Sequence, residues 1–200
     1  MTRRVVVTGI GVISPLGTKE QLWNSLLDGV SGVGRITHFD ASDYPVQIAA
    51  EVKDFDATEY MEPKAARRMD LFCQYAVAAA VQSLADAELE ITEANAHRVG
   101  VLIGSGIGGL NTIENQLHVL KEKGVNRVSP FLVPMLIPDM ASGQTAIITG
   151  AKGPNSCTVT ACASGTHSIG DAFRIIERGN ADVMLAGGAE AGITPLAMAG

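Results

Sequence analysis

The most informative part of the chain is residues 155–167, which read NSCTVTACASGTH. Its first half is rich in β-branched and small residues, a composition typical of a short buried strand. Its second half leads into apolar residues that recur at helical spacing, namely Ile169, Ala172, Phe173 and Ile176. Gly179 follows as a C-terminal cap. We therefore predict a strand that passes directly into a helix from about Ala163 to Arg178, with Cys162 at the turn between them.

The position of Cys162 predicts a reactive thiol. A side chain in the first turn of a helix faces unpaired backbone N–H groups and the positive end of the helix dipole, which favour the thiolate over the thiol. The thiolate is the form that attacks electrophiles, and the same N–H groups could hold an oxyanion formed on an attacked carbonyl. The small residues on either side of Cys162 leave room for a substrate to reach the sulfur.

The alternative interpretation is that Cys162 is a small buried hydrophobic residue, as free cysteines usually are. The strand-to-helix turn and its small neighbours favour the nucleophile. Cys73 and Cys157 keep the structural interpretation, because Cys73 lies on the apolar stripe of a predicted helix and Cys157 lies within the predicted strand.

The remaining patterns indicate alternating strands and helices. We expect strands at residues 3–9, where Val5, Val6 and Val7 suit a strand buried on both faces, and at 46–52, 98–103 and 182–188. Helical stripes occur at residues 22–27, 63–84, 110–120 and 138–148, and the second of these buries Met69, Phe72, Cys73, Ala76, Val77, Ala80 and Leu84. Such alternation predicts an α/β layered fold with a largely parallel sheet.

A glycine-rich segment follows the strand predicted at 98–103. Gly104, Gly106 and Gly109 satisfy the dinucleotide fingerprint G-x-G-x-x-G. That fingerprint belongs to the first strand of its domain and needs an acidic residue at the end of the second strand, about 20 residues on. The available candidate, Glu122, lies at a helix end. Binding of nicotinamide or flavin is therefore disfavoured, and we expect no cofactor.

Composition narrows the class of protein. The 200 residues, 46% of them hydrophobic, can bury one substantial core, and a net charge of -6 argues against a general nucleic-acid binder. Three cysteines without evident pairing, no signal peptide and no apolar run long enough to cross a bilayer predict a cytoplasmic protein with reduced thiols. No Cys and His spacing suggests a metal site. His167 points away from Cys162 on the predicted helix and is expected to pack or form hydrogen bonds.

A cluster of basic residues lies at the start of the helix predicted from Pro63. Lys64, Arg67 and Arg68 lie within about one and a half turns. Charge runs are usually solvated helix faces. On an otherwise acidic protein, however, such a cluster is also what electrostatic steering toward an acidic partner would use.

Residues 160–165 and 181–190, which read TACASG and ADVMLAGGAE, resemble the nucleophile region of the β-ketoacyl-acyl-carrier-protein synthases. The elongating enzymes of type II fatty-acid synthesis are the most similar members. The resemblance runs from residues 4–9 to the last residue. It implies a thiolase-like fold of two pseudo-symmetric halves, so that residues 1–200 form one domain, the N-terminal half only, apparently truncated before the second half.

The resemblance also implies a function. Cys162 would accept an acyl group, and the full enzyme would extend acyl chains on acyl carrier protein by two carbons, by decarboxylative Claisen condensation with malonyl-carrier and without a cofactor. It implies a homodimer, with Leu132 lent to the partner's acyl pocket. The implied acyl-pocket residues are Ile107, Leu132 and Ala161, and the implied carrier-docking residues are Lys64, Arg67 and Arg68.

Some of the machinery for condensation is absent from these residues. The family stabilises the enolate with two histidines, a lysine and a second oxyanion-hole N–H that come from the other half of the protein, so we expect this chain alone to be inactive in condensation. Two alternatives remain open. The chain could be a non-condensing relative that holds acyl groups or acts as a dimer partner, or it could be a polyketide ketosynthase domain, which shares the nucleophile motif.

Overall fold

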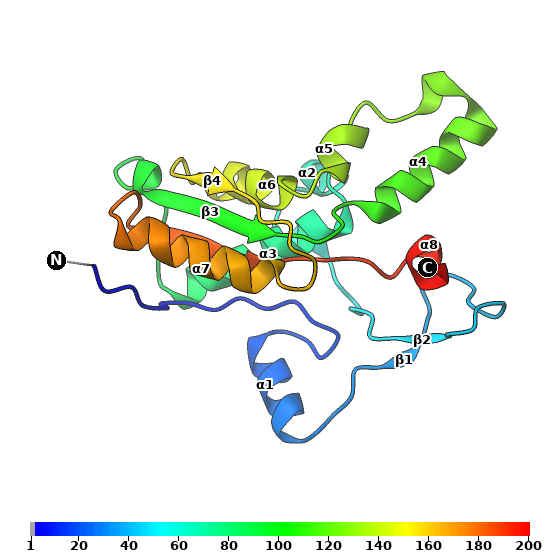
Figure 1. Cartoon of the computed structure of the whole chain (residues 1–200), viewed down its shortest axis with the longest axis horizontal. Coiled ribbons are helices and arrows are strands. Elements are labelled where there is room, and N and C mark those ends of the chain that lie inside the picture. The colour runs from blue at the N-terminus through cyan, green and yellow to red at the C-terminus, as the bar shows by residue number, and fades with distance from the viewer. Residues whose placement is uncertain (1–2) are drawn as a thin grey trace.

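The computed structural model describes residues 3–200, and within them a small parallel sheet forms the centre of the molecule (Figure 1). Strand β3 (Val99–Gly104) lies between β4 (Asn155–Ser156) and β5 (Val183–Gly188). Both partners are parallel to β3, with Val101 opposite Asn155 and Gly104 opposite Gly188. All six residues of β3 are buried, as expected for a strand covered on both faces.

Helices cover both faces of this sheet. Helix α7 (Ser164–Glu177) packs on β3 and β5, whereas α6 (Met140–Thr149) packs on β3 and α3 (Leu71–Asp86). Alternate residues of β3 face the two layers, because successive side chains of a strand point to opposite faces. Val101 and Ile103 face the α3 side, and Gly104 faces α7. The predicted layered α/β arrangement is confirmed.

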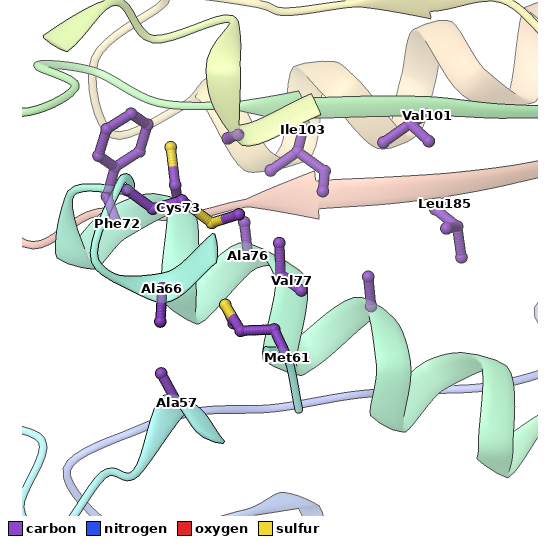
Figure 2. Close-up of a cluster of buried hydrophobic side chains, with 13 residues drawn as sticks. Ala57, Met61, Ala66, Phe72, Cys73, Ala76, Val77, Val101, Ile103 and Leu185 are labelled. Carbon is purple, nitrogen blue, oxygen red and sulfur yellow. The ribbon is translucent and has the colours of Figure 1, made fainter. Parts of the chain in front are cut away.

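The main core lies between α3 and the sheet (Figure 2). Phe72, Cys73 and Val77 of α3 are fully buried, and Val101 and Leu185 face them from the strands. The predicted apolar face of this helix is confirmed, with Leu84 partly buried at its edge.

The helix expected over residues 63–84 is two helices. Helix α2 (Pro63–Ala66) has Pro63 in its first turn, and α3 starts only at Leu71. Asp70 causes the interruption: its backbone is extended, and its buried carboxylate accepts a hydrogen bond from the Phe72 N–H at 3.3 Å. An N-cap of this kind starts a new helix.

The strand expected at residues 3–9 is wrong. Val6 and Val7 are 62% and 79% exposed, and the segment has no strand partner among the described residues. Just beyond it, the N–H groups of Ile10 and Val12 donate instead to side chains of α3, Asp86 at 2.9 Å and Gln82 at 3.0 Å. β-Branched residues form a strand only where a neighbouring strand edge offers hydrogen bonds. The β-propensity of Val5, Val6 and Val7 is therefore not enough to form a strand here. An apolar cavity of about 740 Å³ separates this segment from β5.

The remaining helices and strands lie outside the central sheet. Helix α1 (Lys19–Leu27) leads to an antiparallel pair, β1 (Gly34–Arg35) and β2 (Ile48–Ala49), the latter within the predicted edge strand at 46–52. The rest are α4 (Leu110–Lys123), α5 (Leu132–Leu136), α8 (Pro195–Ala199) and the 3₁₀ turns Ala57–Glu59, Ala96–Arg98 and Val125–Arg127. Helices α4 and α6 end at Gly124 and Gly150, as predicted. No helix within residues 3–200 combines the length and apolar character needed to cross a membrane.

Candidate active site

The segment between β4 and α7 carries Cys162. Helix α7 starts at Ser164 with Ala163 as its N-cap residue, one residue later than predicted. Cys162 therefore lies immediately before the N-cap and not in the first turn. Its side chain is exposed, which agrees with the expectation of a reachable sulfur.

The backbone before Cys162 is held in an unusual conformation by Ser164. Ala161 has a φ of 50°, in the left-handed region that costs a residue with a side chain about 1–2 kcal/mol. The buried Ser164 hydroxyl accepts from the Thr160 N–H at 2.9 Å and donates to the Ala161 carbonyl at 2.7 Å. The sequence analysis missed this role. A signal was present, because Ser near a helix start is a common partner for nearby backbone groups.

A second side chain anchors the same segment to α7. The Thr158 hydroxyl donates to the Ser164 carbonyl at 2.9 Å and lies 2.7 Å from the Ser168 hydroxyl. Ser168 is fully buried. The backbone on the strand side of Cys162 is thus tied to the helix that follows it, which restricts the position of the thiol.

The first turn of α7 offers free hydrogen-bond donors. The N–H groups of Gly165 and Thr166 have no acceptor in the part of the chain that the structure describes. Such groups, with the positive end of the helix dipole, favour negative charge beside the turn. An oxyanion formed on a carbonyl attacked by Cys162 would be stabilised there.

The glycines at the ends of β3 and β5 let α7 approach the sheet closely. A Cβ on Gly104 would lie 2.6 Å from Thr158 Oγ1 and 2.8 Å from Ser164 Cβ, and one on Gly188 would lie 2.8 Å from Gly165 Cα. The first glycine of the G-x-G-x-x-G match therefore faces the segment that carries Cys162. This packing explains the motif without a dinucleotide.

The loop that carries Ile107 approaches Ala161 through Gly106. Ile107 is 49% exposed on the loop after β3, and a Cβ on neighbouring Gly106 would lie 3.3 Å from Ala161 Cα. Leu132 is at the far end of α5, whose last residue, Leu136, accepts from the Gly109 N–H of that loop at 2.8 Å. The sequence analysis missed Glu190, whose carboxylate accepts hydrogen bonds from Gly106 and Ile107.

The predicted docking residues form an exposed basic patch at α2. Lys64, Arg67 and Arg68 are all exposed, and none has an acidic partner among residues 3–200. The Arg68 guanidinium lies 4.5 Å from the centre of the Phe131 ring, a cation–π contact that the sequence did not reveal. Arg68 therefore connects the patch to the residue that precedes α5.

The other two cysteines are structural, as predicted. Cys73 is buried in the core, where desolvation raises the pKa of its thiol far above the usual value. Partial burial also raises the pKa of Cys157, which follows β4 instead of lying within the strand. Both thiols therefore stay protonated near neutral pH.

His167 forms polar contacts with Thr160 and Asp171. Its Nδ1 lies 3.3 Å from Thr160 Oγ1, and its Nε2 lies 3.3 Å from a carboxylate oxygen of Asp171. This matches the role expected from its position on the helix. The described residues contain no group of three or more side chains placed to hold a metal ion.

Sequence comparisons relate the chain to one family. The family profile described as the β-ketoacyl synthase N-terminal domain matches residues 2–200. The chain is 56% identical over 199 residues to 3-oxoacyl-[acyl-carrier-protein] synthase 2 of Synechocystis sp., and 54% identical over 199 residues to the protein of that name from Staphylococcus aureus strain COL. These alignments cover 99% of this chain and 48% of each relative, so the chain spans about half the length of these curated relatives.

Solved structures agree with this relationship. The ishigamide ketosynthase/chain length factor superposes on this chain with a TM-score of 0.89 at 32% sequence identity. The alignment covers 100% of this chain and 50% of the other protein's chain. A β-ketoacyl synthase from Burkholderia phymatum gives 0.84 at 29% identity, covering 100% of this chain and 49% of its own. A type II polyketide ketosynthase, solved with its acyl-carrier protein, gives 0.83 at 26% identity, covering 99% of this chain and 54% of its own.

These matches confirm the predicted thiolase-like α/β fold and its correspondence to an N-terminal half. The profile spans nearly every residue, including the turn that carries Cys162. The chain therefore belongs to the β-ketoacyl synthase family, of which it contains the N-terminal domain.

Proposed function

We propose that this chain carries the acyl-accepting nucleophile of a 3-oxoacyl-acyl-carrier-protein synthase that elongates fatty acyl chains by two carbons. The observation that supports this most directly is the exposed Cys162, held next to the free N–H donors of α7. The curated relatives, at 53–56% identity, carry the name of that activity.

In the first step, Cys162 Sγ attacks the thioester carbonyl of an acyl-carrier. A new carbon–sulfur bond forms, and backbone N–H groups hold the oxyanion of the tetrahedral intermediate. The carbon–sulfur bond to the carrier then breaks, and the carrier thiolate takes up, through solvent, the proton that the Cys162 thiol released. This chain would supply Cys162 and the N–H donors of α7 for the transfer, and we propose that the second oxyanion-hole N–H comes from the family's other half. In the second step, loss of carbon dioxide from malonyl-carrier supplies an enolate that attacks the acyl-enzyme and frees Cys162. We propose that this step uses residues of the family's other half.

Carrier binding is proposed for the basic patch of Lys64, Arg67 and Arg68. An acyl carrier protein is strongly acidic, and unpaired cations attract it over a longer range than neutral surface does. The structure of the similar type II polyketide ketosynthase contains its acyl-carrier protein, which supports a partner of this kind.

The remaining assignments are proposals from the resemblance. Ile107 and Ala161 would contact the acyl chain beside Cys162, and Leu132 would contribute to the pocket of a second protomer in a homodimer. A cytoplasmic location is proposed from composition. The close approach of Gly106, the neighbour of Ile107, to Ala161 supports the first of these.

Acylation measured by mass spectrometry tests the nucleophile. The chain is incubated with an acyl-carrier thioester, alongside Cys162→Ser and the matched control Cys157→Ser. We expect the acyl mass on the wild type and on the Cys157 variant but not on the Cys162 variant, because a hydroxyl is far less ionised near neutral pH. Full acylation of Cys162→Ser would refute the assignment.

A parallel assay tests the division of labour and the polyketide alternative. Acylation without release of carbon dioxide from malonyl-carrier agrees with the proposed division of labour, and also with a non-condensing relative that holds acyl groups. Carbon dioxide release by this chain alone would contradict the division. Preferential acylation by polyketide-type 3-ketoacyl chains over saturated ones would favour a polyketide ketosynthase, a class represented among the structures at 26% identity.

A further inference from the structure

Strands β3 and β5 end side by side at the candidate site. Gly104 pairs with Gly188, and the Ala189 N–H extends the ladder by donating to the Gly104 carbonyl at 3.0 Å. The next residue, Glu190, lies opposite residues 105–109, the loop that follows β3. Its side chain is therefore placed against the backbone of that loop.

The Glu190 carboxylate makes three hydrogen bonds to the loop. Oε2 accepts from the N–H groups of Gly106 at 2.8 Å and Ile107 at 3.2 Å, and Oε1 accepts from the Ser105 hydroxyl at 3.0 Å. Successive N–H groups that converge on one point form an anion-binding concavity, which the chain's own carboxylate occupies here. Because the Ser105 hydroxyl also accepts from the Gly108 N–H at 3.1 Å, the network reaches most of the loop.

The loop, in turn, contacts the nucleophile segment. A Cβ on Gly106 would lie 3.0 Å from Glu190 Oε2 and 3.3 Å from Ala161 Cα. Gly106 is thus held between the carboxylate and the residue directly before Cys162. A loop released from Glu190 would change both the space beside the sulfur and the position of Ile107.

We propose that Glu190 is a positioning residue for acyl transfer. It holds residues 105–109 against Ala161 and so determines where Ile107 lies relative to Cys162. Glu190 acts through the loop and not on the reacting atoms. The inference rests on the proposed function of Cys162, but the contact between Glu190 and the loop can be tested without it.

Amide hydrogen exchange on the full chain tests the contact. In Glu190→Ala, the Gly106 and Ile107 amides should exchange about tenfold faster, because hydrogen bonds to a charged acceptor are lost. Glu190→Gln keeps a neutral oxygen acceptor and should restore part of the protection. The control Glu177→Ala removes an acid that pairs with Arg174 at 2.7 Å, and should leave loop exchange unchanged. Unchanged exchange in Glu190→Ala would overturn the proposal.

Two reactions of Cys162 test the consequence. Acyl transfer from an acyl-carrier needs the ordered loop, whereas alkylation by iodoacetamide needs only a reachable thiol. We expect Glu190→Ala to lower the acylation rate about tenfold, with Glu190→Gln intermediate, while alkylation stays at the wild-type rate. If the rates of both reactions and the thermal midpoint all fall in Glu190→Ala, Glu190 is merely structural and the inference is wrong.

The two proposals fail in different ways. A wild-type chain that is not acylated contradicts the proposed function, and with it the acyl-transfer part of this inference. The exchange measurement then still decides whether Glu190 holds the loop. A wild-type chain that is acylated, with acylation unaffected in Glu190→Ala, leaves the proposed function intact and overturns the positioning role alone.

Discussion

One hydroxyl group, that of Ser164, determines how Cys162 is presented. Ala161 takes a left-handed backbone conformation at a cost of about 1–2 kcal/mol. The two hydrogen bonds of Ser164 to Thr160 and Ala161 offset this cost, because each contributes about 0.5–1.5 kcal/mol. Strain next to a reactive group is common at functional sites, and here it turns the chain so that the sulfur is exposed.

The three cysteines should differ in their rates of chemical labelling. With iodoacetamide near neutral pH, Cys162 should react first because it is exposed. Cys157 should react more slowly, and Cys73 only after unfolding, because burial raises the pKa of both thiols and blocks the reagent. Peptide mass spectrometry over time measures this order. If Cys73 in the folded chain were labelled as fast as Cys162, its burial in the core would be contradicted.

At the scale of elements, Asp70 joins two helices. Its carboxylate caps α3 and also accepts from the Thr112 N–H at 3.0 Å and the Thr112 hydroxyl at 2.6 Å in the first turns of α4. All these groups are buried, so each lost bond leaves an unsatisfied donor. Asp70, at the break between α2 and α3, therefore connects the start of α3 to the start of α4, the helix that follows the glycine-rich loop.

Removal of this carboxylate should be costly. We expect Asp70→Ala to lower the free energy of unfolding by about 2–3 kcal/mol, the sum of a lost cap and of buried donors without partners. Denaturant titration followed by circular dichroism measures it. The matched control is Asp56→Ala, which removes an exposed cap that accepts from the Thr58 N–H at 2.8 Å and should cost about 1 kcal/mol or less. Equal losses for the two variants would contradict the role of burial.

At the scale of the whole molecule, charge is unevenly distributed. The chain has a net charge of -6, yet Lys64, Arg67 and Arg68 remain unpaired and exposed among the described residues. Three other arginines, Arg3, Arg98 and Arg174, form ion pairs. Arg98 binds Asp182 through two nitrogens, at 2.8 and 3.0 Å, and so connects the starts of β3 and β5.

Charge reversal tests the proposed docking patch. The triple variant of Lys64, Arg67 and Arg68 to Glu should weaken association with an acyl carrier protein about tenfold at low salt, and the difference should shrink as salt screens the charges. Surface plasmon resonance at two salt concentrations measures both effects. Reversal of Lys121, Lys123 and Arg127, at and just after the end of α4, is the control with the same change in net charge. An equal loss in the control would mean that total charge, and not the patch, attracts the carrier.

The Arg98–Asp182 pair predicts a dependence of stability on acid. Hydrogen bonds and charge from Arg98 and then Arg3 hold the pKa of Asp182 well below its usual 3.8. A lowered folded-state pKa means that the stabilisation is complete above the usual value and is lost as pH falls through the lower one. Asp182→Asn should therefore lower the thermal midpoint at pH 7, by a margin that disappears in strong acid. The control Asp43→Asn changes an exposed acid without an ion pair in the described part of the chain and should leave the thermal midpoint at pH 7 unchanged.

Sequence motifs were sufficient for the family. Local patterns were sufficient for the helices that end at Gly124 and Gly150, for the buried face of α3 and, to within one residue, for the start of the helix after Cys162, because periodicity and capping depend on neighbouring residues. Only the tertiary structure decided that Val5–Val7 lack a strand partner, that Arg68 stacks on Phe131 and that Glu190 holds the loop after β3. Each of these depends on groups distant in sequence, 84 residues apart for Glu190 and Gly106. Such contacts form only after the strands and helices have packed, so no local signal specifies them.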